Sequence, residues 1–288
     1  MMHYLRWLIV GIARRGLLDW VPNSIYLRIV YRLMMKKSLN LESPQTFNEK
    51  LQYLKVYDYK PEYTQWVDKI RAKKLVMEIL GEQYVVPILG VWDKAEQIDF
   101  GVLPDKFVLK CSHDQGSVVL CDKTKKIDEK AIRAFLNLHL KLNIYRGTRE
   151  YPYKNIKPKI LCEKYLGANI VDYKFHCFNG KPLFLYVGQG LTADHSLKID
   201  FFSVEWQPMP FYRTDYRRLG NAIARPKQLK LMTAIAEKLS AGTRFVRIDL
   251  FEVNNQVYFS EYTLYPGSGY MPFVPEEYDE IVGSWLEL

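Results

Sequence analysis

The sequence predicts an α+β fold with antiparallel strands. In residues 244–251 and again in residues 258–263, apolar side chains alternate with other side chains, as in half-buried strands. Asn254 and Asn255 between them tolerate the positive φ of a tight turn. The same pattern flanks Asn179 and Gly180, a dipeptide typical of hairpin turns. Helical periodicity completes the assignment and is found in residues 24–37, 68–80, 127–145 and 227–239.

The composition is that of a globular protein with one large or two modest domains. The chain has 288 residues, of which 48% are hydrophobic and 25% are charged. Its net charge of +9 permits nucleic acid, an anionic membrane, or a phosphorylated or acidic small substrate as a partner. Because the cysteines form no C-x-x-C pair, they are expected to be reduced, mostly buried thiols of a cytoplasmic protein. They are Cys111, Cys121, Cys162 and Cys177.

The first apolar run, residues 7–13, is far shorter than the ~20 residues that span a bilayer. It also lacks the small-residue cleavage site of a secretory signal. The favoured interpretation is a helix docked on the domain. The alternative is peripheral membrane contact through residues 1–37, with a basic amphipathic helix on an anionic leaflet supported by Trp7, Trp20 and Lys36–Lys37. Leu5, Leu8, Ile9 and Ile12 form the apolar stripe of this helix.

Local signals place the next elements in order. Thr46 and Glu49 form a capping box, which predicts the start of a helix. A further helix is expected over residues 68–80, where Gly81 ends it, and a short strand over residues 84–87.

Residues 106–111 and 118–121 indicate two strands around a small polar loop. The backbone N–H groups of this loop and the ammonium group of Lys110 are suited to face an anion. Residues 127–145 predict one amphipathic helix whose stripe packs against a sheet. Residues 159–167 predict a strand that runs into a turn. The members of the helical stripe are Ala131, Phe135, Leu138 and Leu142.

Two loop-rich stretches carry basic and aromatic side chains. Residues 146–158 are expected to form a solvated loop, with the lining of an acceptor site as the alternative. Residues 188–225 suit a sugar or a carboxylated glycan, and plain surface is the equal alternative.

The hairpin of residues 244–263 brings chemically useful groups together. Asp249 and Glu261 lie on its neighbouring strands, and Arg247 shares the face of Asp249. Such charges are costly to keep dry unless something occupies the site, and Mg2+ shared with substrate phosphates would fit. The alternative, favoured without other evidence, is a surface hairpin with a cross-strand Arg–Asp pair. The turn at residues 266–269 is expected to be flexible, with backbone amides available to an anion.

These runs resemble the metal-binding end of ATP-grasp ligases. The motifs are R-I-D-L, which contains Asp249, and S-E-Y-T-L-Y-P-G-S-G over residues 260–269. The run P-Q-T-F-N-E-K-L-Q-Y-L-K from residue 44 resembles one branch, the TupA-like ATP-grasp proteins of bacterial surface-polysaccharide clusters, which are named for teichuronopeptide synthesis. The resemblance covers residues 43–269.

The resemblance implies an ATP-grasp fold, in which two lobes with antiparallel sheets hold the nucleotide between them, here with a helical N-terminal extension. It divides the chain into four parts. They are the extension (1–60), a pre-grasp helix and strand region (61–105), a small lobe with the phosphate loop (106–165) and a large lobe with the metal site (166–288).

The resemblance also implies roles for individual residues. Asp249 and Glu261 would hold Mg2+, with Thr263 at a position where the family usually has asparagine. Arg247 and Lys110 would act in catalysis. His113 is compatible with a general base, but local hydrogen bonding or ligand contact is the favoured role. The residues expected to bind ATP are Lys73, Lys110, His113, Gly116 and Ser117 at the phosphates, Glu163, Tyr165 and Leu166 at the adenine, and Asp172 at the ribose. Lys174 shares the face of Asp172 and is expected to contact phosphate, with an edge-strand salt bridge as the alternative.

The implied activity is that of an ATP- and Mg2+-dependent carboxylate–amine ligase. A carboxylate would attack the γ-phosphate to form an acyl phosphate, and an amine would then displace phosphate. The resemblance further implies surface-polysaccharide or capsule biosynthesis, a carboxylate such as a uronic acid residue of a lipid-linked glycan, and a place on the inner face of the cytoplasmic membrane.

Two other classes of function remain open from the sequence. A glycosyltransferase would use a nucleotide-sugar and a metal, but the sequence has no D-x-D motif and the paired lysines would lack a purpose. A non-catalytic binder of membrane or nucleic acid would need its cations on one face. Here 41 basic and 32 acidic residues are scattered along the chain, and no nucleic-acid partner is expected.

Overall fold

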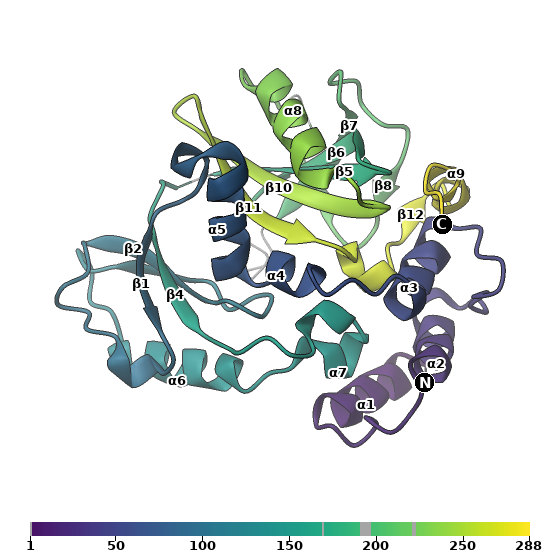
Figure 1. The fold of residues 1–288 in the computed structure, drawn as a ribbon, viewed down its shortest axis with the longest axis horizontal. Coiled ribbons are helices and arrows are strands. Elements are labelled where there is room, and N and C mark those ends of the chain that lie inside the picture. Colours follow the sequence, from purple (N-terminus) through teal and green to yellow (C-terminus); the bar gives the residue numbers. More distant parts are fainter. Residues whose placement is uncertain (1, 169, 191–196, 221–222) are drawn as a thin grey trace.

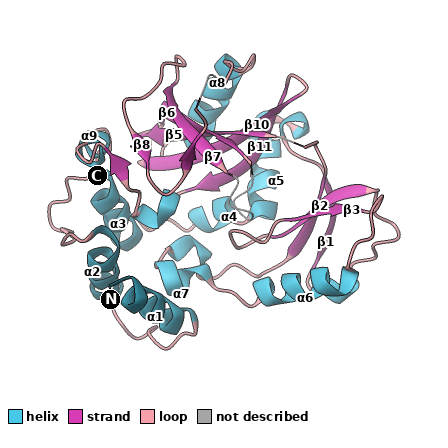
Figure 2. Ribbon diagram, turned by 180° about the vertical axis from the view of Figure 1, so that it is seen from behind, coloured by secondary structure: helices cyan, strands magenta, loops and turns pink. Residues whose placement is uncertain are grey.

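The computed structural model describes residues 2–168, 170–190, 197–220 and 223–288. Two sheets, each with helices on it, form the body of the chain, and the helices α1 and α2 lie beside this body (Figure 1). Most strand pairs are antiparallel, so the α+β prediction is confirmed. The same layers are seen from behind in Figure 2.

The smaller sheet has four antiparallel strands in the order β1-β4-β2-β3. Apolar side chains of one face, such as Phe107 and Cys162, pack with Leu136 of helix α6 (Glu129–Leu140). The opposite face carries Lys110 and Glu163 toward helix α5 (Lys69–Leu80). The strands are β1 (Ile88–Trp92), β2 (Lys106–Cys111), β3 (Val119–Asp122) and β4 (Ile160–Lys164).

The larger sheet has six strands in the order β11-β10-β5-β6-β7-β9, and β9 pairs with β7 in parallel. Helix α8 (Leu229–Ser240) covers one face and buries Met232, Ile235 and Ala236 there. The other face bears charged residues near the smaller sheet. The strands are β5 (Val171–Phe178), β6 (Lys181–Gln189), β7 (Lys198–Ser203), β9 (Arg217–Arg218), β10 (Phe245–Val253) and β11 (Gln256–Thr263).

Further elements surround these sheets. Strands β8 (Tyr212–Arg213) and β12 (Phe273–Val274) form a two-stranded sheet. The remaining helices are α1 (Met2–Arg14), α2 (Asn23–Met35), α3 (Phe47–Tyr57), α4 (Tyr63–Val67), α7 (Ile144–Thr148) and α9 (Tyr278–Ser284), with short 3-10 turns at Glu82–Tyr84, Ala95–Gln97, Tyr151–Tyr153 and Pro266–Gly269. In the described part of the chain, no helix is long and apolar enough to cross a membrane.

Most local predictions are confirmed. Thr46 and Glu49 form both hydrogen bonds of a capping box at the start of α3. Asn254 and Asn255 have φ of 51° and 65° in the β10–β11 turn. Gly81 follows α5, and all four cysteines are free and buried. The four-part division of the chain stays a prediction, and β1, from residues 61–105, pairs with β4 of the smaller sheet.

Three local predictions are wrong. Residues 84–87 form no strand, because Val85 makes only an isolated bridge to Phe259. The helix expected over residues 127–145 ends at Leu140, and α7 follows it. The predicted stripe of this helix is exposed, whereas Leu136 is fully buried against the sheet. The exposed members are Ala131, Phe135, Leu138 and Leu142.

The C-terminal helix α9 closes the body of the chain against α3. The backbone N–H of Asn48 donates to Asp279 at 2.9 Å, and the Asn48 amide exchanges hydrogen bonds with the backbone of Met271. At Gly283 the two helices approach so closely that an added Cβ would lie 2.3 Å from the carbonyl oxygen of Gln45 and 2.7 Å from the backbone nitrogen of Phe47.

We therefore expect Gly283→Ala to lower the free energy of unfolding by ~1–3 kcal/mol, because backbone atoms on both helices must move apart. Chemical denaturation followed by circular dichroism measures this change. The matched control is Gly11→Ala in α1, where the added Cβ meets no atom within 4 Å. It should be neutral or stabilising by up to ~1 kcal/mol. Equal effects of the two substitutions would contradict the close α3–α9 contact.

Candidate functional site

Three neighbouring strands of the larger sheet bring six predicted site residues together on one face. Strand β10 lies between β5 and β11, and its register places Lys174 and Glu261 on either side of Asp249. Side chains two residues apart on a strand share a face. The residues two positions away on each strand therefore lie on the same face as Lys174, Asp249 and Glu261. The six residues are Asp172 and Lys174 on β5, Arg247 and Asp249 on β10, and Glu261 and Thr263 on β11.

Asp249 is the centre of this cluster. Its carboxylate is fully buried and accepts hydrogen bonds at 2.6 Å from Arg247 Nε, Arg247 Nη2 and Lys174 Nζ. Arg247 Nη2 also donates to Thr263 Oγ1 at 2.9 Å and lies 3.5 Å from Glu261. The alternative interpretation, a surface hairpin with a cross-strand Arg–Asp pair, is therefore wrong, because Asp249 is buried and lies on the same strand as Arg247. Charges held this deep need all of these partners.

The charges of the cluster fix one another. Burial favours the neutral form of Glu261, but Lys69, Lys174 and Arg247 together lower its pKa to about 2. Burial would lower the pKa of Lys174, yet Asp172 and Asp249 raise it above its ordinary value. Burial raises the pKa of Asp172, against the attraction of Lys174. Glu261 is thus an anion at neutral pH, and its side chain remains 32% exposed.

A second charged cluster lies on the smaller sheet, with the opposite excess of charge. Glu163 of β4 forms ion pairs with Lys73 Nζ of α5 at 2.9 Å and with Lys110 Nζ of β2 at 2.7 Å. Burial would raise the pKa of Glu163, but the two lysines lower it to about 2. Burial lowers the pKa of Lys73 to about 8, although Glu163 opposes this shift. Two ammonium groups are thus held side by side by one carboxylate.

The two clusters face each other. Lys69 and Lys110, from the side of the smaller sheet, both help to lower the pKa of Glu261 on the larger sheet. Lys69 is fixed by its backbone N–H, which donates to Ser112 at 2.9 Å, and by its Nζ, which donates to the Asp114 carbonyl. Lys69 was not among the site residues predicted from the sequence, although it opens the same helix as Lys73.

The loop between β2 and β3 is tied to its own lobe. Ser117 Oγ donates to Asp114 at 2.5 Å and accepts from the backbone N–H of Cys111 at 2.8 Å. The ring of His113 lies 3.0 Å from the carbonyl of Leu142, as expected for local hydrogen bonding. Gly116 has φ of 91°, and an added Cβ there would meet open space. The side chains of His113 and Ser117 are therefore engaged within the lobe, whereas the backbone at Gly116 faces open space.

Apolar side chains surround Lys110 on the same face of the smaller sheet. Val108, two residues before Lys110, pairs with Leu120, which is 52% exposed, and Val91 pairs with Leu161. This face is suited to a flat aromatic base. It could not be predicted from the sequence, because half-exposed apolar residues are common on edge strands. Tyr165 and Leu166 follow β4 and are half-buried in the connection to the larger sheet.

The turn Pro266–Gly269 after β11 is held by helix α3 and is not the flexible turn expected from the sequence. Gln52 Nε2 donates to the carbonyls of Ser268 and Gly269 at 3.0 and 2.8 Å. Lys55 Nζ donates to the Ser268 carbonyl at 2.8 Å, and Ser268 Oγ donates to the buried Glu150 at 2.6 Å. Long-range contacts of this kind carry no signal in a local sequence pattern.

The solvated loop expected over residues 146–158 is instead buried in part, and it includes the end of α7 and a 3-10 turn. Arg149 and Glu150 are 1% and 2% exposed, and Tyr153 is 8% exposed. Burial raises the pKa of Tyr153 well above its ordinary value, and Glu150 and Glu261 raise it further, so Tyr153 lies near both carboxylates.

Asp249, Glu261 and Thr263 are the candidate oxygen ligands for Mg2+ on the larger sheet. Among the described residues, no group of three or more His, Cys, Asp or Glu side chains is arranged to enclose a metal. Mg2+ commonly takes one or two carboxylates and completes its shell with phosphates and water. Asp249 and Glu261 fit this requirement, because they are directly opposed and Glu261 is ionised and partly exposed. Thr263 Oγ1 accepts from Arg247 and adds a hydroxyl oxygen nearby.

Comparison with family models gives a match across most of the chain. The family model described as TupA-like ATPgrasp matches residues 49–287. Comparison with curated proteins gave no match.

Solved structures with similarity to this chain include three synthetases. A D-alanine–D-alanine ligase from Bacillus anthracis, solved with ATP, is 15% identical over 69% of this chain and 55% of its own, with a TM-score of 0.40. N5-carboxyaminoimidazole synthetase from Staphylococcus aureus is 14% identical over 69% and 44%, with a TM-score of 0.40. D-alanyl-alanine synthetase A from Vibrio cholerae is 15% identical over 75% and 62%, with a TM-score of 0.41. The chain thus spans about half the length of these proteins.

The bridge between Glu163 and the two lysines predicts an acid dependence of stability. The pKa of Glu163 is lowered from 4.5 to about 2 in the folded chain, so the unfolded chain binds this proton more readily. The stabilisation is complete above about pH 4.5 and is lost as the pH falls toward about 2. We expect Glu163→Gln to reduce the slope of the free energy of unfolding against pH in this window.

Urea unfolding at a series of pH values measures this slope. The exposed Glu287→Gln is the control and should leave the slope near that of the wild type. Parallel slopes for Glu163→Gln and the wild type would show that Glu163 is not held as a charged bridge.

Proposed function

Because the chain belongs to the TupA-like ATP-grasp family, we propose that it is an ATP- and Mg2+-dependent carboxylate–amine ligase that forms an amide bond. The observation that carries the proposal is the facing pair of clusters. The ionised Glu261 beside Asp249 lies within electrostatic range of Lys69 and Lys110 across the two sheets. A metal ion and the phosphates of a nucleotide are complementary to these two clusters.

In this proposal the smaller sheet binds the nucleotide. Lys73 and Lys110, held by Glu163, place two cations for the phosphates, and the backbone around Gly116 covers them. The exposed apolar face beside Lys110, with Tyr165 and Leu166 of the connection, takes the adenine. Asp172, on the other sheet, takes the ribose hydroxyls. Glu163 would have two roles. It would bind the adenine from its position at the hinge, and it holds the two lysines.

The chemistry proceeds in two steps. A substrate carboxylate oxygen attacks the γ-phosphorus, and the bond to the bridging oxygen breaks, which yields an acyl phosphate and ADP. An amine nitrogen then attacks the acyl carbon, phosphate leaves, and the amine loses a proton. Mg2+ held by Asp249 and Glu261 would neutralise charge on the phosphates when bound. Arg247 and Lys110 supply fixed positive charge where negative charge develops, which is the main source of rate enhancement in phosphoryl transfer.

We further propose surface-polysaccharide biosynthesis as the setting, with a uronic acid residue of a lipid-linked glycan as the carboxylate and an amino acid as the amine. The net charge of +9 and the basic residues of strand β9 favour an acidic substrate. The protein would work in the cytoplasm on the inner face of the membrane and contact it through residues 1–37.

The first test is thermal stabilisation by nucleotides. We expect ATP and ADP with Mg2+ to raise the melting temperature, because a ligand that binds only the folded chain stabilises it by mass action. UDP-sugars are the comparison, and each ligand is measured with and without Mg2+. A shift with UDP-sugars alone would replace the proposal with glycosyl transfer, and no shift with any nucleotide would favour a non-catalytic binder.

The second test is Asp249→Asn. We expect turnover, measured as ADP released with carboxylate and amine pairs, to fall by at least ~100-fold, because a carboxylate ligand of the proposed metal is lost. Binding of adenine nucleotide should change little, because the adenine contacts lie on the other sheet.

Controls separate catalysis from folding in this test. Asp105→Asn, at an exposed position, should retain full turnover. Glu261→Gln removes the less buried carboxylate and should also lose turnover, which covers the case in which Asp249→Asn fails to fold. Full turnover in either folded site variant would remove that residue from the metal site.

A further inference from the structure

The turn between α1 and α2 exposes large apolar side chains. Trp20 is 81% exposed and Leu17 is 62% exposed, which makes Trp20 the most exposed large apolar side chain in the described part of the chain. Leu8 of α1 and Ile25 and Ile29 of α2 are each about half exposed. We call these five residues the N-terminal apolar surface. Exposed apolar groups gathered in one segment mark a contact site more often than scattered ones do.

Packing inside the extension does not explain this surface. Helices α1 and α2 already bury a separate apolar side, which includes Ala13, Leu27 and Val30. Ile25 and Ile29 are one helical turn apart on α2 and are exposed, although they flank the buried Leu27. The two helices therefore carry apolar side chains on the inside and on the outside.

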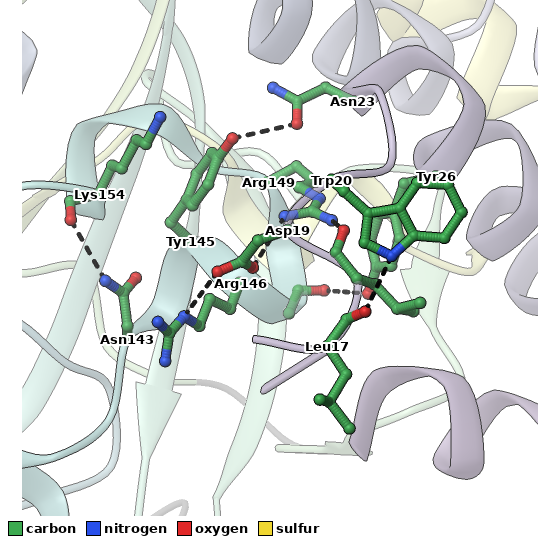
Figure 3. Close-up of polar contacts among 12 residues, drawn as sticks. Leu17, Asp19, Trp20, Asn23, Tyr26, Asn143, Tyr145, Arg146, Arg149 and Lys154 are labelled. Atoms are coloured by element: carbon green, nitrogen blue, oxygen red, sulfur yellow. Dashed lines mark hydrogen bonds and ion pairs between the residues drawn. The ribbon is translucent and has the colours of Figure 1, made fainter. Parts of the chain in front are cut away.

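The turn is fixed from its inner side, as Figure 3 shows. Asp19 lies 3.2 Å from Arg146 and 3.7 Å from Arg149, and Arg149 Nη2 donates to the carbonyl of Leu18 at 2.5 Å. Trp20 Nε1 donates to the Leu17 carbonyl at 3.1 Å, which satisfies the indole within the turn. Because Asp19 and Leu18 bind the body of the protein, Leu17 and Trp20 are held in their exposed positions.

Additional contacts fix the start of α2 to the same part of the body. Tyr145 donates to Asn23 at 3.1 Å, and Tyr26 donates to the carbonyl of Gly147 at 2.9 Å. The apolar turn is thus a rigid projection, so little conformational entropy remains to be lost when it meets a partner.

The charge of this segment selects the kind of partner. Residues 1–37 contain seven lysines and arginines and one acidic residue, Asp19, which gives a net charge of +6. Asp19 is paired with arginines outside the segment, and Arg28 and Lys37 are paired with Glu42 and Glu276 outside it. The side chains of Arg14, Arg15 and Arg32 are exposed. The basic residues are Arg6, Arg14, Arg15, Arg28, Arg32, Lys36 and Lys37.

We propose that the N-terminal apolar surface inserts into the headgroup region of an anionic phospholipid bilayer. Apolar and tryptophan side chains that enter the interface, together with lysines and arginines in the same segment, are the features of a peripheral anchor. The α1 and α2 helices have 13 residues each and are too short to span a bilayer. The inference deepens the proposed function by assigning residues to its membrane contact, with Leu17 and Trp20 at the centre.

Flotation of the full chain with vesicles, without nucleotide, tests this inference. We expect binding to phosphatidylcholine vesicles that contain phosphatidylglycerol, at least ~10-fold weaker binding to phosphatidylcholine alone, and weaker binding in high salt. Trp20→Glu should reduce binding to the anionic vesicles at least ~10-fold. Val102→Glu is the matched control, because Val102 is 77% exposed in the segment before β2 and the change in charge is the same. It should bind as the wild type does.

Three outcomes would overturn the inference. They are no binding to anionic vesicles, equal loss in both variants, and a concentration-dependent dimer that Trp20→Glu disrupts without any vesicle binding, which would assign the surface to a second copy of the chain. Leu17→Ser with Trp20→Ser adds no charge and should weaken binding as well. Because nucleotide is absent, failure here leaves the ligase proposal intact, and failure of nucleotide binding leaves this one intact.

Discussion

The site depends on one buried carboxylate. Asp249 lies in a central strand with no exposed surface, and two cations from two strands satisfy its oxygens. Removal of either the carboxylate or its cations would strongly destabilise the fold, because a lone charge at this depth would lack both solvation and a partner. The antiparallel register that brings Lys174, Asp249 and Glu261 into one row is therefore fixed by electrostatics as well as by apolar packing. A slip of one residue would turn these charges into the core under α8.

The opposite excess of charge in the two clusters gives the site its direction. On the larger sheet three carboxylates meet two cations, Lys174 and Arg247, which leaves the side of Glu261 and Asp172 anionic. On the smaller sheet two lysines share one carboxylate, Glu163, which leaves that side cationic. Neither cluster is neutral alone, and a cation bound to phosphates is complementary to both when it lies between them.

The sequence predicted the parts of this arrangement that follow from local patterns. The β10–β11 hairpin and its pairing of Asp249 with Glu261 follow from alternation and from the two asparagines that accept positive φ. The buried face of helix α6 could not be predicted from its apolar pattern, because the helix carries two apolar stripes. Packing against the smaller sheet selects the one with Leu136 and leaves Phe135 and Leu138 outside. The alternation predicts a half-buried sheet, and the full burial of Asp249 goes beyond this prediction, because Lys174 comes to the Asp249 carboxylate from a strand 75 residues away in the sequence.

The largest gap between sequence and structure lies at Arg149 and Glu150, where a polar stretch that resembles a loop is buried. These adjacent residues bind in two different places. Arg149 binds the turn between α1 and α2 through Leu18 and Asp19, and Glu150 binds Ser268 in the turn after β11. Lys55 of α3 completes the second contact. The N-terminal extension and the turn after β11 are thus fixed to one short segment. A protein anchored through Leu17 and Trp20 would therefore hold its site in a defined position above the membrane, where the proposed lipid-linked substrate would be presented.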